Sequence, residues 1–295
     1  MGDRLFRRDV ALNIGGLRIA SRLTDETRAQ LGYSEEDQSN ILKVSFNITK
    51  TIKKEPNKCD LQIYNLKKDN RIALQKRQVE TIVEAGYVDN TSVLFQGALE
   101  YSASVQDGSD WVTSLQAFDG SDKTKKKRVN KSLKGPAKAR DVLNAAAKAL
   151  GLKTGNLKSA IGRGSVRGNL SEFSNGIVLS GRADRVLDSV ARSMGYFYSI
   201  QDGHLILLTQ KDFLGTDAIL ISPDTGMVGS PEPGEDGFVT VRTMIQPNLL
   251  PAHRVKIVAG EIEGFYRIER VDFTGDTWGP DWYADLECRP LGGAS

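Results

Sequence analysis

His204 and His253 are the only histidines in the chain, and they are its most versatile candidates for chemistry. Near neutral pH a histidine can act as a base, a proton shuttle or a metal ligand. Neither lies near a cysteine or a carboxylate pair at ligand spacing, so the sequence predicts no zinc or di-iron site. We expect His204, which follows a predicted turn, to be structural. The G-x-S-x-G motif is absent, although a Ser-His-Asp arrangement drawn from distant positions stays open.

Two stretches have residue types that can bind phosphate. Five of the six residues at 123–128, "KTKKKR", are basic. We interpret this run as a solvated loop between domains, with phosphate binding as the sharper alternative, because no interleaved aromatic residue supports base stacking. The sequence "GRGSVRG" at 162–168 has the spacing G-x-G-x-x-x-G. It follows no predicted strand and opens no predicted helix, so it does not fit a dinucleotide-binding loop.

Carboxylates are plentiful, but no pattern gathers them into a cleft. Hydrolysis of a glycosidic bond needs two carboxyl groups at a defined separation. We expect the paired acids of the chain to lie on solvated loops: Glu35, Glu36, Glu232, Glu235 and Asp236. The sequence therefore predicts no catalytic, cofactor-binding or metal-binding residue and no cofactor.

Composition indicates an ordinary soluble globular protein. The chain of 295 residues is 39% apolar and 26% charged, with a net charge of +3, too small to argue for nucleic acid or an anionic membrane. No run of about eighteen apolar residues predicts a membrane-spanning helix, and "MGDRLFRRDV" lacks the apolar centre of a secretion signal. We expect Cys59 and Cys288 to be free buried thiols, although a bridge between them stays open.

The N-terminal segment predicts strands, because apolar residues alternate over 9–19, 41–52 and 59–66. After a short surface helix at 67–77, strand composition returns at 78–87, 92–105 and 110–118, with a hairpin turn at Asp107-Gly108. The long polar stretch 21–40 predicts a loop that is mobile in the free chain and orders on assembly, with proteolysis near Arg28.

The middle segment predicts two amphipathic helices and a hairpin. Apolar residues recur at helical spacing in 135–152, between Pro136 and Gly151, and again in 181–200. We expect Leu143 and Leu187, at the centres of these apolar faces, to be buried. A hairpin with the turn Asp202-Gly203 follows, and the Gly- and Ser-rich link between the helices is predicted to be irregular.

The last segment returns to alternating strands at 218–222, 237–245, 253–260, 265–275 and 282–290. Prolines fall between them, where no ladder hydrogen bond is lost. In the final strand Trp282, Ala284, Leu286 and Cys288 share one face, and Tyr283, Asp285 and Glu287 share the other. We expect the first set, with Phe273 and Trp278, to close a second barrel.

The chain therefore predicts a mainly β fold with an α+β insert. Two small β-barrels, over 1–122 and 213–295, flank a two-helix plus hairpin module at 123–212. Two barrels, a spacer and no catalytic set favour a structural or binding protein.

Three stretches in this order resemble the baseplate hub proteins of tailed bacteriophages. The first is "FNITKTIKKEPNKCDLQIYNLKKDNR" at 46–71, followed by "VEAGY" and "VLFQGAL". The second is "GPAKARDVLNAAAKALGL" at 135–152. The third is "TGMVGSPEPGEDGFVTVRTMIQPNLLPAHRVKI" at 225–257, closed by "YRIERVDFTGDTWGPDWYADLEC". The resemblance covers most of the chain and is weakest at 100–135 and 152–180. The loop 21–40 and the turn Gln246-Pro247-Asn248 depart from the family pattern.

The resemblance implies a structural virion protein whose two barrels each resemble a tail-tube subunit. Three chains would form a homotrimer, a pseudo-six-fold ring that joins the tail tube to the central spike and lines the channel for genome ejection. The implied partners are the tail tube protein, the central spike protein and other baseplate proteins. Viral DNA would pass through without sequence-specific binding, and assembly would take place in the host cytoplasm.

Two other functions stay open at this point. Some hub-like proteins are fused to cell-wall hydrolases, but no segment is left over here for a catalytic glutamate in a cleft or a zinc triad. The basic run "KTKKKR" alternatively suggests a nucleic-acid-binding barrel of the OB kind, which predicts salt-sensitive DNA binding.

Overall fold

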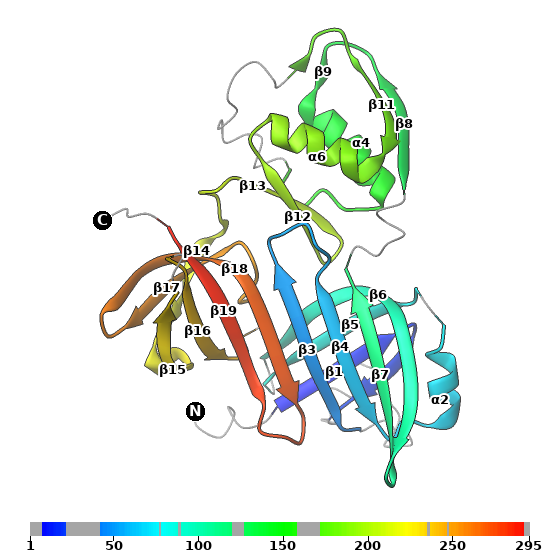
Figure 1. The fold of residues 1–295 in the computed structure, drawn as a ribbon, viewed down its shortest axis with the longest axis vertical. Helices are drawn as coiled ribbons and strands as arrows, with labels where there is room; N and C mark the ends of the chain where they lie inside the picture. Colours follow the sequence, from blue (N-terminus) through cyan, green and yellow to red (C-terminus); the bar gives the residue numbers. More distant parts are fainter. Residues whose placement is uncertain are drawn as a thin grey trace. The chain divides into compact units, whose positions relative to one another are not determined.

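The computed structural model describes residues 8–21, 42–76, 78–87, 90–119, 127–157, 172–234, 237–246 and 248–291 (Figure 1). Contacts divide the chain into two compact units. The sheet unit comprises Met1–Lys50, Lys58–Phe118 and Leu214–Ser295, and the helical unit comprises Thr51–Asn57 and Asp119–Phe213. The helical unit includes residues 123–212, the predicted middle module, together with Thr51–Asn57, and the predicted domain boundaries stay a prediction. The loop predicted at 21–40 falls outside the described residues from 22 onward.

The sheet unit contains strands from both ends of the chain. Its N-terminal elements are β1 (Arg8–Ile14), β2 (Leu17–Ala20), β3 (Val44–Thr51), β4 (Lys58–Tyr64), α2 (Lys68–Ala73), β5 (Glu80–Tyr87), β6 (Asn90–Asp107) and β7 (Asp110–Phe118). Its C-terminal elements are β14 (Leu214–Ile221), the 3-10 turn η3 (Pro223–Thr225), β15 (Met227–Pro233), β16 (Val239–Met244), β17 (His253–Ala259), β18 (Ile262–Asp276) and β19 (Trp282–Pro290). The predicted strands and the surface helix are therefore confirmed.

One sheet of thirteen strands connects the two segments. Its main path runs β15-β16-β19-β18-β3-β4-β7-β6-β5-β1-β2, and β17 pairs with β18 and β14. The segments meet where β18 lies beside β3 (Figure 1). At this junction Val44 N donates to Thr277 Oγ1 at 3.0 Å, and Thr277 N donates back to Val44 O at 3.0 Å. The predicted division into two tube-like barrels, over 1–122 and 213–295, stays a prediction.

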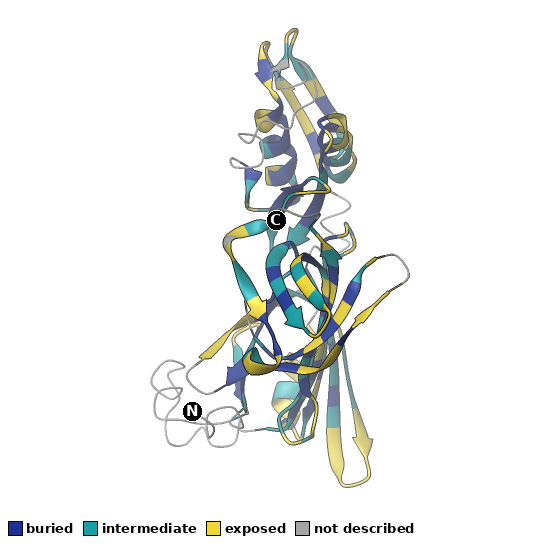
Figure 2. Ribbon diagram, turned by 90° about the vertical axis from the view of Figure 1, so that its left-hand side faces the viewer, coloured by how far each residue is buried: buried dark blue, intermediate teal, exposed yellow. Residues whose placement is uncertain are grey.

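Alternating burial shows why these sequences form strands. In β3 the side chains of Val44, Phe46 and Ile48 are buried, while Ser45 and Thr49 are half-buried and Asn47 is exposed. Figure 2 shows the same alternation of buried and less buried residues along the strands. Burying every second side chain against an apolar core fixes the register, because a slip of one residue would reverse the two faces.

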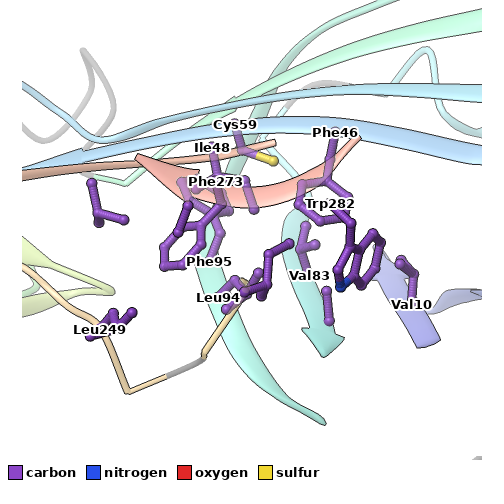
Figure 3. Packing of buried hydrophobic residues seen from close by; sticks show 14 of the residues in the cluster. Val10, Phe46, Ile48, Cys59, Val83, Leu94, Phe95, Leu249, Phe273 and Trp282 are labelled. Carbon is purple, nitrogen blue, oxygen red and sulfur yellow. The ribbon is translucent and has the colours of Figure 1, made fainter. Parts of the chain in front are cut away.

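A single apolar cluster fills the sheet unit and takes residues from both segments. Phe46, Phe95, Phe273 and Trp282 lie within it (Figure 3). The ring of Trp282 meets those of Phe46 and Tyr87 edge-on, with centroids 5.6 and 6.3 Å apart. These edge-to-face contacts add to the free energy gained by burying aromatic surface. Trp282 therefore joins the two segments.

The final strand confirms the predicted faces but not the predicted role of both tryptophans. Trp282, Ala284, Leu286 and Cys288 are buried, and the intervening residues are half-buried or exposed. The side chain of Trp278, in contrast, is 72% exposed. The expectation that Trp278 closes a barrel core is wrong. Trp278 lies in the turn between β18 and β19, where the inward–outward alternation of a strand does not direct its side chain into the core.

The helical unit surrounds two helices, α4 (Ala139–Leu150) and α6 (Ala183–Ser193), which pack against each other (Figure 1). Leu143 and Leu187 are fully buried between them, as predicted. Gly151 and Gly195 end the helices with positive φ angles of 78° each, a conformation that glycine adopts without strain. The predicted hairpin is also confirmed: β12 (Phe197–Gln201) pairs with β13 (His204–Leu208) across Asp202-Gly203.

Four short strands of the helical unit were not predicted. They are β8 (Arg128–Leu133), β9 (Ala137–Lys138), β10 (Glu172–Phe173) and β11 (Ile177–Arg182). β8 pairs with β11 and β9 with β10, both antiparallel. Arg128 therefore ends the basic run inside a strand, and Glu172–Phe173, within the link that was expected to be irregular, form β10. These strands are polar because only part of one face is covered, so their sequences carry little alternation.

Candidate functional site

The outer face of the central strands in the sheet unit is built from both segments. The inner side chains of β19, β18, β3 and β4 enter the core, so the residues between them form a second face. We call this the polar sheet face. Its members along these strands, with two from β16, are Ser45, Asn47, Thr49, Lys58, Asp60, Gln62, Arg270, Asp272, Thr274, Tyr283, Asp285, Glu287, Thr240 and Arg242.

Strand register brings these side chains together from distant parts of the sequence. Asn47 stands opposite Asp60, Asp272 opposite Asp285, and Arg242 also opposite Asp285. Thr49 Oγ1 donates to Asp272 Oδ1 at 2.5 Å, which links the faces of β3 and β18. The face is thus continuous across the junction of the two segments.

Each cation of the polar sheet face is paired with a carboxylate of the same face. Arg242 binds Asp285 through two parallel bonds, from Nε at 2.7 Å and from Nη2 at 3.0 Å. Arg270 binds Asp272 in the same way, at 2.7 and 3.0 Å. The Lys58 ammonium lies 2.8 Å from Asp60 Oδ2. Hydrogen bonds to Asp285 and Asp272 raise the pKa values of Arg242 and Arg270.

This pairing determines how the face responds to a polyanion. Proteins hold nucleic acid mainly through Lys and Arg side chains that neutralise phosphates. Here three cations are already satisfied by three aspartates, and Glu287 adds a further negative charge. The remaining groups are mainly hydroxyls and amides. The polar sheet face therefore offers hydration but little net attraction for phosphate.

The residues considered for catalysis do not come together in the described part of the chain. Half-buried His204 faces the carbonyl of Asp202, with Nδ1 3.1 Å from the oxygen. Half-buried His253 faces the carbonyl of Pro251 at 3.4 Å, and burial lowers its pKa. No group of three His, Cys, Asp or Glu residues suited to a metal ion occurs among the described residues.

Both cysteines are free and buried in the sheet unit. Burial raises the pKa of the Cys59 thiol, as does nearby Asp60, while Lys50 acts in the opposite direction. Burial also raises the pKa of Cys288, assisted by Glu269 and Glu287. A thiol with a raised pKa is a poor nucleophile at neutral pH. These cysteines serve as small apolar core residues.

Most candidate phosphate and carboxylate positions lie outside the described residues. These are 123–126 of the basic run, the glycine-rich 162–168, and Glu35, Glu36, Glu235 and Asp236. Lys127 is described, and its ammonium donates to the Leu150 carbonyl at 2.9 Å, at the end of α4. Glu232 is exposed on β15.

The sequence interpretation missed two buried cations. Lys50 is fully buried, and its ammonium donates to Leu94 O at 3.1 Å. Arg267 is also fully buried, and its Nε donates to Glu269 Oε1 at 2.8 Å. The sequence held a signal for Lys50, because alternation along β3 places it on the same face as the buried residues Phe46 and Ile48. Buried charge is retained only where partners compensate for lost hydration.

Arg8 is a third residue that sequence alone did not identify. Its guanidinium donates to the carbonyls of Asp276 and Pro280, both at 2.9 Å, and to that of Gly279. It also lies 5.4 Å from the centre of the Trp282 ring. Arg8 thus fastens the first strand to the turn that precedes the last strand.

The fold of this chain is similar to that of phage tail proteins. It superposes on the 43 kDa tail protein of prophage MuSo2 from Shewanella oneidensis with a TM-score of 0.63, at 10% identity, over 96% of this chain and 97% of that chain. It superposes on the tail protein from Neisseria meningitidis MC58 with a TM-score of 0.62, at 11% identity, over 97% of each chain.

A further structural likeness extends to secretion machinery. The E. coli c3393 protein, a type VI secretion component similar in structure to the T4 tail proteins gp27 and gp5, gives a TM-score of 0.52 at 9% identity. That alignment covers 84% of this chain and 73% of the c3393 chain. At such low identities these likenesses show the fold alone.

The family follows from the sequence. The family described as baseplate hub gp41 matches residues 26–288, so the chain belongs to the baseplate hub gp41 family. No curated protein sequence matches it. Membership makes this a structural protein of the bacteriophage tail baseplate hub, as the sequence resemblance predicted. In the described part of the chain, no helix is both long and apolar enough to cross a membrane.

Proposed function

We propose that the chain is a hub protomer that assembles as a homotrimer between the tail tube and the central spike. The two β segments of each chain would supply two tube-like contributions, giving a pseudo-six-fold ring. In this ring the polar sheet face lines the channel through which viral DNA leaves the virion. The partners are the tail tube protein, the central spike protein and other baseplate proteins, and assembly takes place in the host cytoplasm.

The pairing of every cation on the polar sheet face carries this proposal. A channel lining must wet the passing DNA but must not hold its phosphates, because each free Lys or Arg adds salt-sensitive affinity. The bidentate pairs Arg242–Asp285 and Arg270–Asp272 keep two guanidinium groups from phosphate. Glu287 biases the face toward repulsion.

Charge-neutralising variants test the lining. Asp272→Asn together with Asp285→Asn leaves Arg270 and Arg242 without their carboxylates. The matched control is Asp107→Asn with Glu232→Gln, which makes the same change in net charge at exposed positions off this face. Fluorescence anisotropy with labelled duplex DNA at low salt should show salt-sensitive binding by the face variant and none by the wild type or the control. DNA binding by the wild type at least as strong as that of the face variant contradicts a non-binding lining.

Light scattering tests the assembly. We expect a mass three times that of the 32.3 kDa chain, either alone or after mixing with the spike protein of the same phage. A monomer under both conditions contradicts the ring. We propose no enzymatic activity, so purified protein should leave peptidoglycan intact in a zymogram; clearing would restore the hydrolase alternative.

A further inference from the structure

A groove in the helical unit contrasts with the polar sheet face. It has a volume of about 390 Å³ and is lined by residues from the end of β8, the turn that follows, and α4. The helix α4 packs against β8. Figure 1 shows these two elements. Three lysines line it: Lys131 from β8, Lys134 from the turn and Lys148 from α4. We call it the lysine groove. Its volume falls within the range of ligand-binding pockets.

The three lysines have no carboxylate partner among the described residues, and all three side chains are exposed. Some other cations of the same unit are paired, among them Lys54 with Asp188, and Arg182 with Asp184 at 2.7 Å. Three ammonium groups around one hollow repel one another, and an anionic ligand removes that repulsion.

The remaining lining favours a peptide over nucleic acid. Asp141 lines the groove, so an anionic ligand must place an uncharged position beside it, which a peptide with spaced carboxylates can do and a continuous phosphate backbone cannot. The apolar part is supplied by Leu133, Pro136, Ala137 and Ala145, which can receive small apolar side chains. Among the described residues that line the groove, none is aromatic, so none can stack on a base. Alternating acidic and small apolar side chains match this lining better than a chain of phosphates.

The strand beside the groove favours a ligand in an extended conformation. Among the described strands β8 has one neighbour, β11, so its other edge is not paired within a sheet. An open strand edge can receive an extended segment through backbone hydrogen bonds, while flanking pockets select its side chains. The groove is lined by residues from the end of this strand.

We propose that the lysine groove binds an extended acidic segment of another protein. The lysines attract the carboxylates and the small apolar floor receives the side chains between them. This site belongs to the helical unit alone, so it does not depend on the ring or on the channel lining. A hub needs docking sites for neighbouring proteins, and this groove is suited to one with an acidic tail or loop.

A labelled model peptide of about twelve residues that alternates glutamate and alanine tests the groove. Full-length protein is titrated by fluorescence anisotropy at low and moderate salt. The groove variant is Lys131→Glu with Lys148→Glu. The matched control is Lys153→Glu with Lys211→Glu, which reverses two exposed lysines of the same unit that do not line the groove. Circular dichroism melting shows whether each variant keeps its fold.

The wild type and the control should bind the acidic peptide, with affinity that falls as salt rises, and the groove variant should bind at least about ten-fold more weakly. A peptide in which lysine replaces glutamate should not bind. Absence of acidic-peptide binding by the wild type overturns the proposal, as does equal loss in both variants. Duplex DNA that competes with the peptide and binds more tightly overturns the peptide assignment.

Should the groove variant not fold, Lys131→Gln with Lys148→Gln replaces it, because this pair removes charge without adding any. Weaker peptide binding by this variant supports the proposal, and unchanged binding overturns it.

Discussion

The cores of the two units differ in how far apart in the sequence their contacting residues lie. The core of the sheet unit runs from Val10 to Cys288 and combines both ends of the chain. The core of the helical unit lies within Val129–Leu207, and its helices, turns and hairpin follow one another along the chain. Contacts between distant residues must overcome a larger loop-closure entropy before they stabilise the fold.

This difference indicates how each unit fails. In the helical unit a substitution weakens a local set of contacts. In the sheet unit β18 and β19 are interior strands, paired with β3 and β16 respectively, so a change near the C-terminus affects contacts made by the N-terminal segment. We therefore expect the two units to respond separately to substitutions, and calorimetry of the full chain to resolve two transitions.

Removal of β19 should have the largest effect. Truncation after Gly279 deletes the partner of both β16 and β18 together with Trp282 and Leu286. We expect the transition of the sheet unit to disappear while that of the helical unit remains. Truncation after Leu291 is the control and should leave both transitions in place. Survival of the sheet transition in the shorter chain would show that β19 is not essential to this core.

Substitution of the two neighbouring tryptophans compares a buried position with an exposed one. Trp282 is 6% exposed and Trp278 is 72% exposed. Trp282→Ala should cost about 3–5 kcal/mol in the free energy of unfolding. Trp278→Ala should change it by no more than about 0.5 kcal/mol.

Fluorescence reports the same contrast directly. A Trp111→Phe, Trp278→Phe variant leaves Trp282 as the single emitter, and we expect blue-shifted emission with little quenching by acrylamide. Emission like that of free tryptophan in the folded protein would contradict its place in the core.

Truncation of a leucine in the helical unit should affect that unit alone. Leu143 and Leu187 are both fully buried, so Leu→Ala at either position should cost about 2–5 kcal/mol through lost burial and the remaining cavity. Only the helical transition should move in calorimetry. Val178→Ala, at a position 69% exposed in the same unit, is the control and should be nearly neutral. A shift of the sheet transition by Leu143→Ala would show that the units unfold together.

Apart from the exposed control positions, removal of the Arg8 guanidinium should have the smallest effect. Arg8→Ala loses charge-assisted hydrogen bonds to carbonyls of the turn before β19 and the contact with Trp282, for a cost of about 1–2 kcal/mol. Arg8→Lys should recover only part of this, because one ammonium cannot match the planar fork of a guanidinium. Chemical denaturation measures both. Full recovery by lysine would mean that positive charge alone suffices.

Several features of the fold were predictable because they depend on neighbours in the sequence. The helical spacing around Leu143 and Leu187 identified both helices and their buried faces, and the Asp202-Gly203 turn identified the hairpin. Alternation in 282–290 gave the buried and exposed faces of β19. The polar strands β8 and β11 were missed because only part of one face of this strand pair is buried. Apolar and polar residues therefore alternate little along their sequences.

The candidate site was less predictable than the elements that carry it. Alternation placed Asp285 and Glu287 on an outer face, but nothing in the sequence paired Asp285 with Arg242 or Asp272 with Arg270 as ion pairs. Those pairs arise from strand order and from side-chain geometry across or along the strands. The family resemblance predicted the hub correctly, whereas the surface that could line a channel appeared only in the structure.

By itself the sequence determined where both long helices and most strands of the sheet unit form and which of their faces are buried, because both depend on side-chain periodicity and on turns of a few residues. The tertiary structure decided that β18 lies beside β3, that Trp282 is buried while Trp278 is exposed, and that the cations of the polar sheet face are paired. Backbone hydrogen bonds are much the same for any two strands, so they do not specify a partner. Partner choice depends on how whole faces pack in three dimensions, which no local stretch of the sequence encodes.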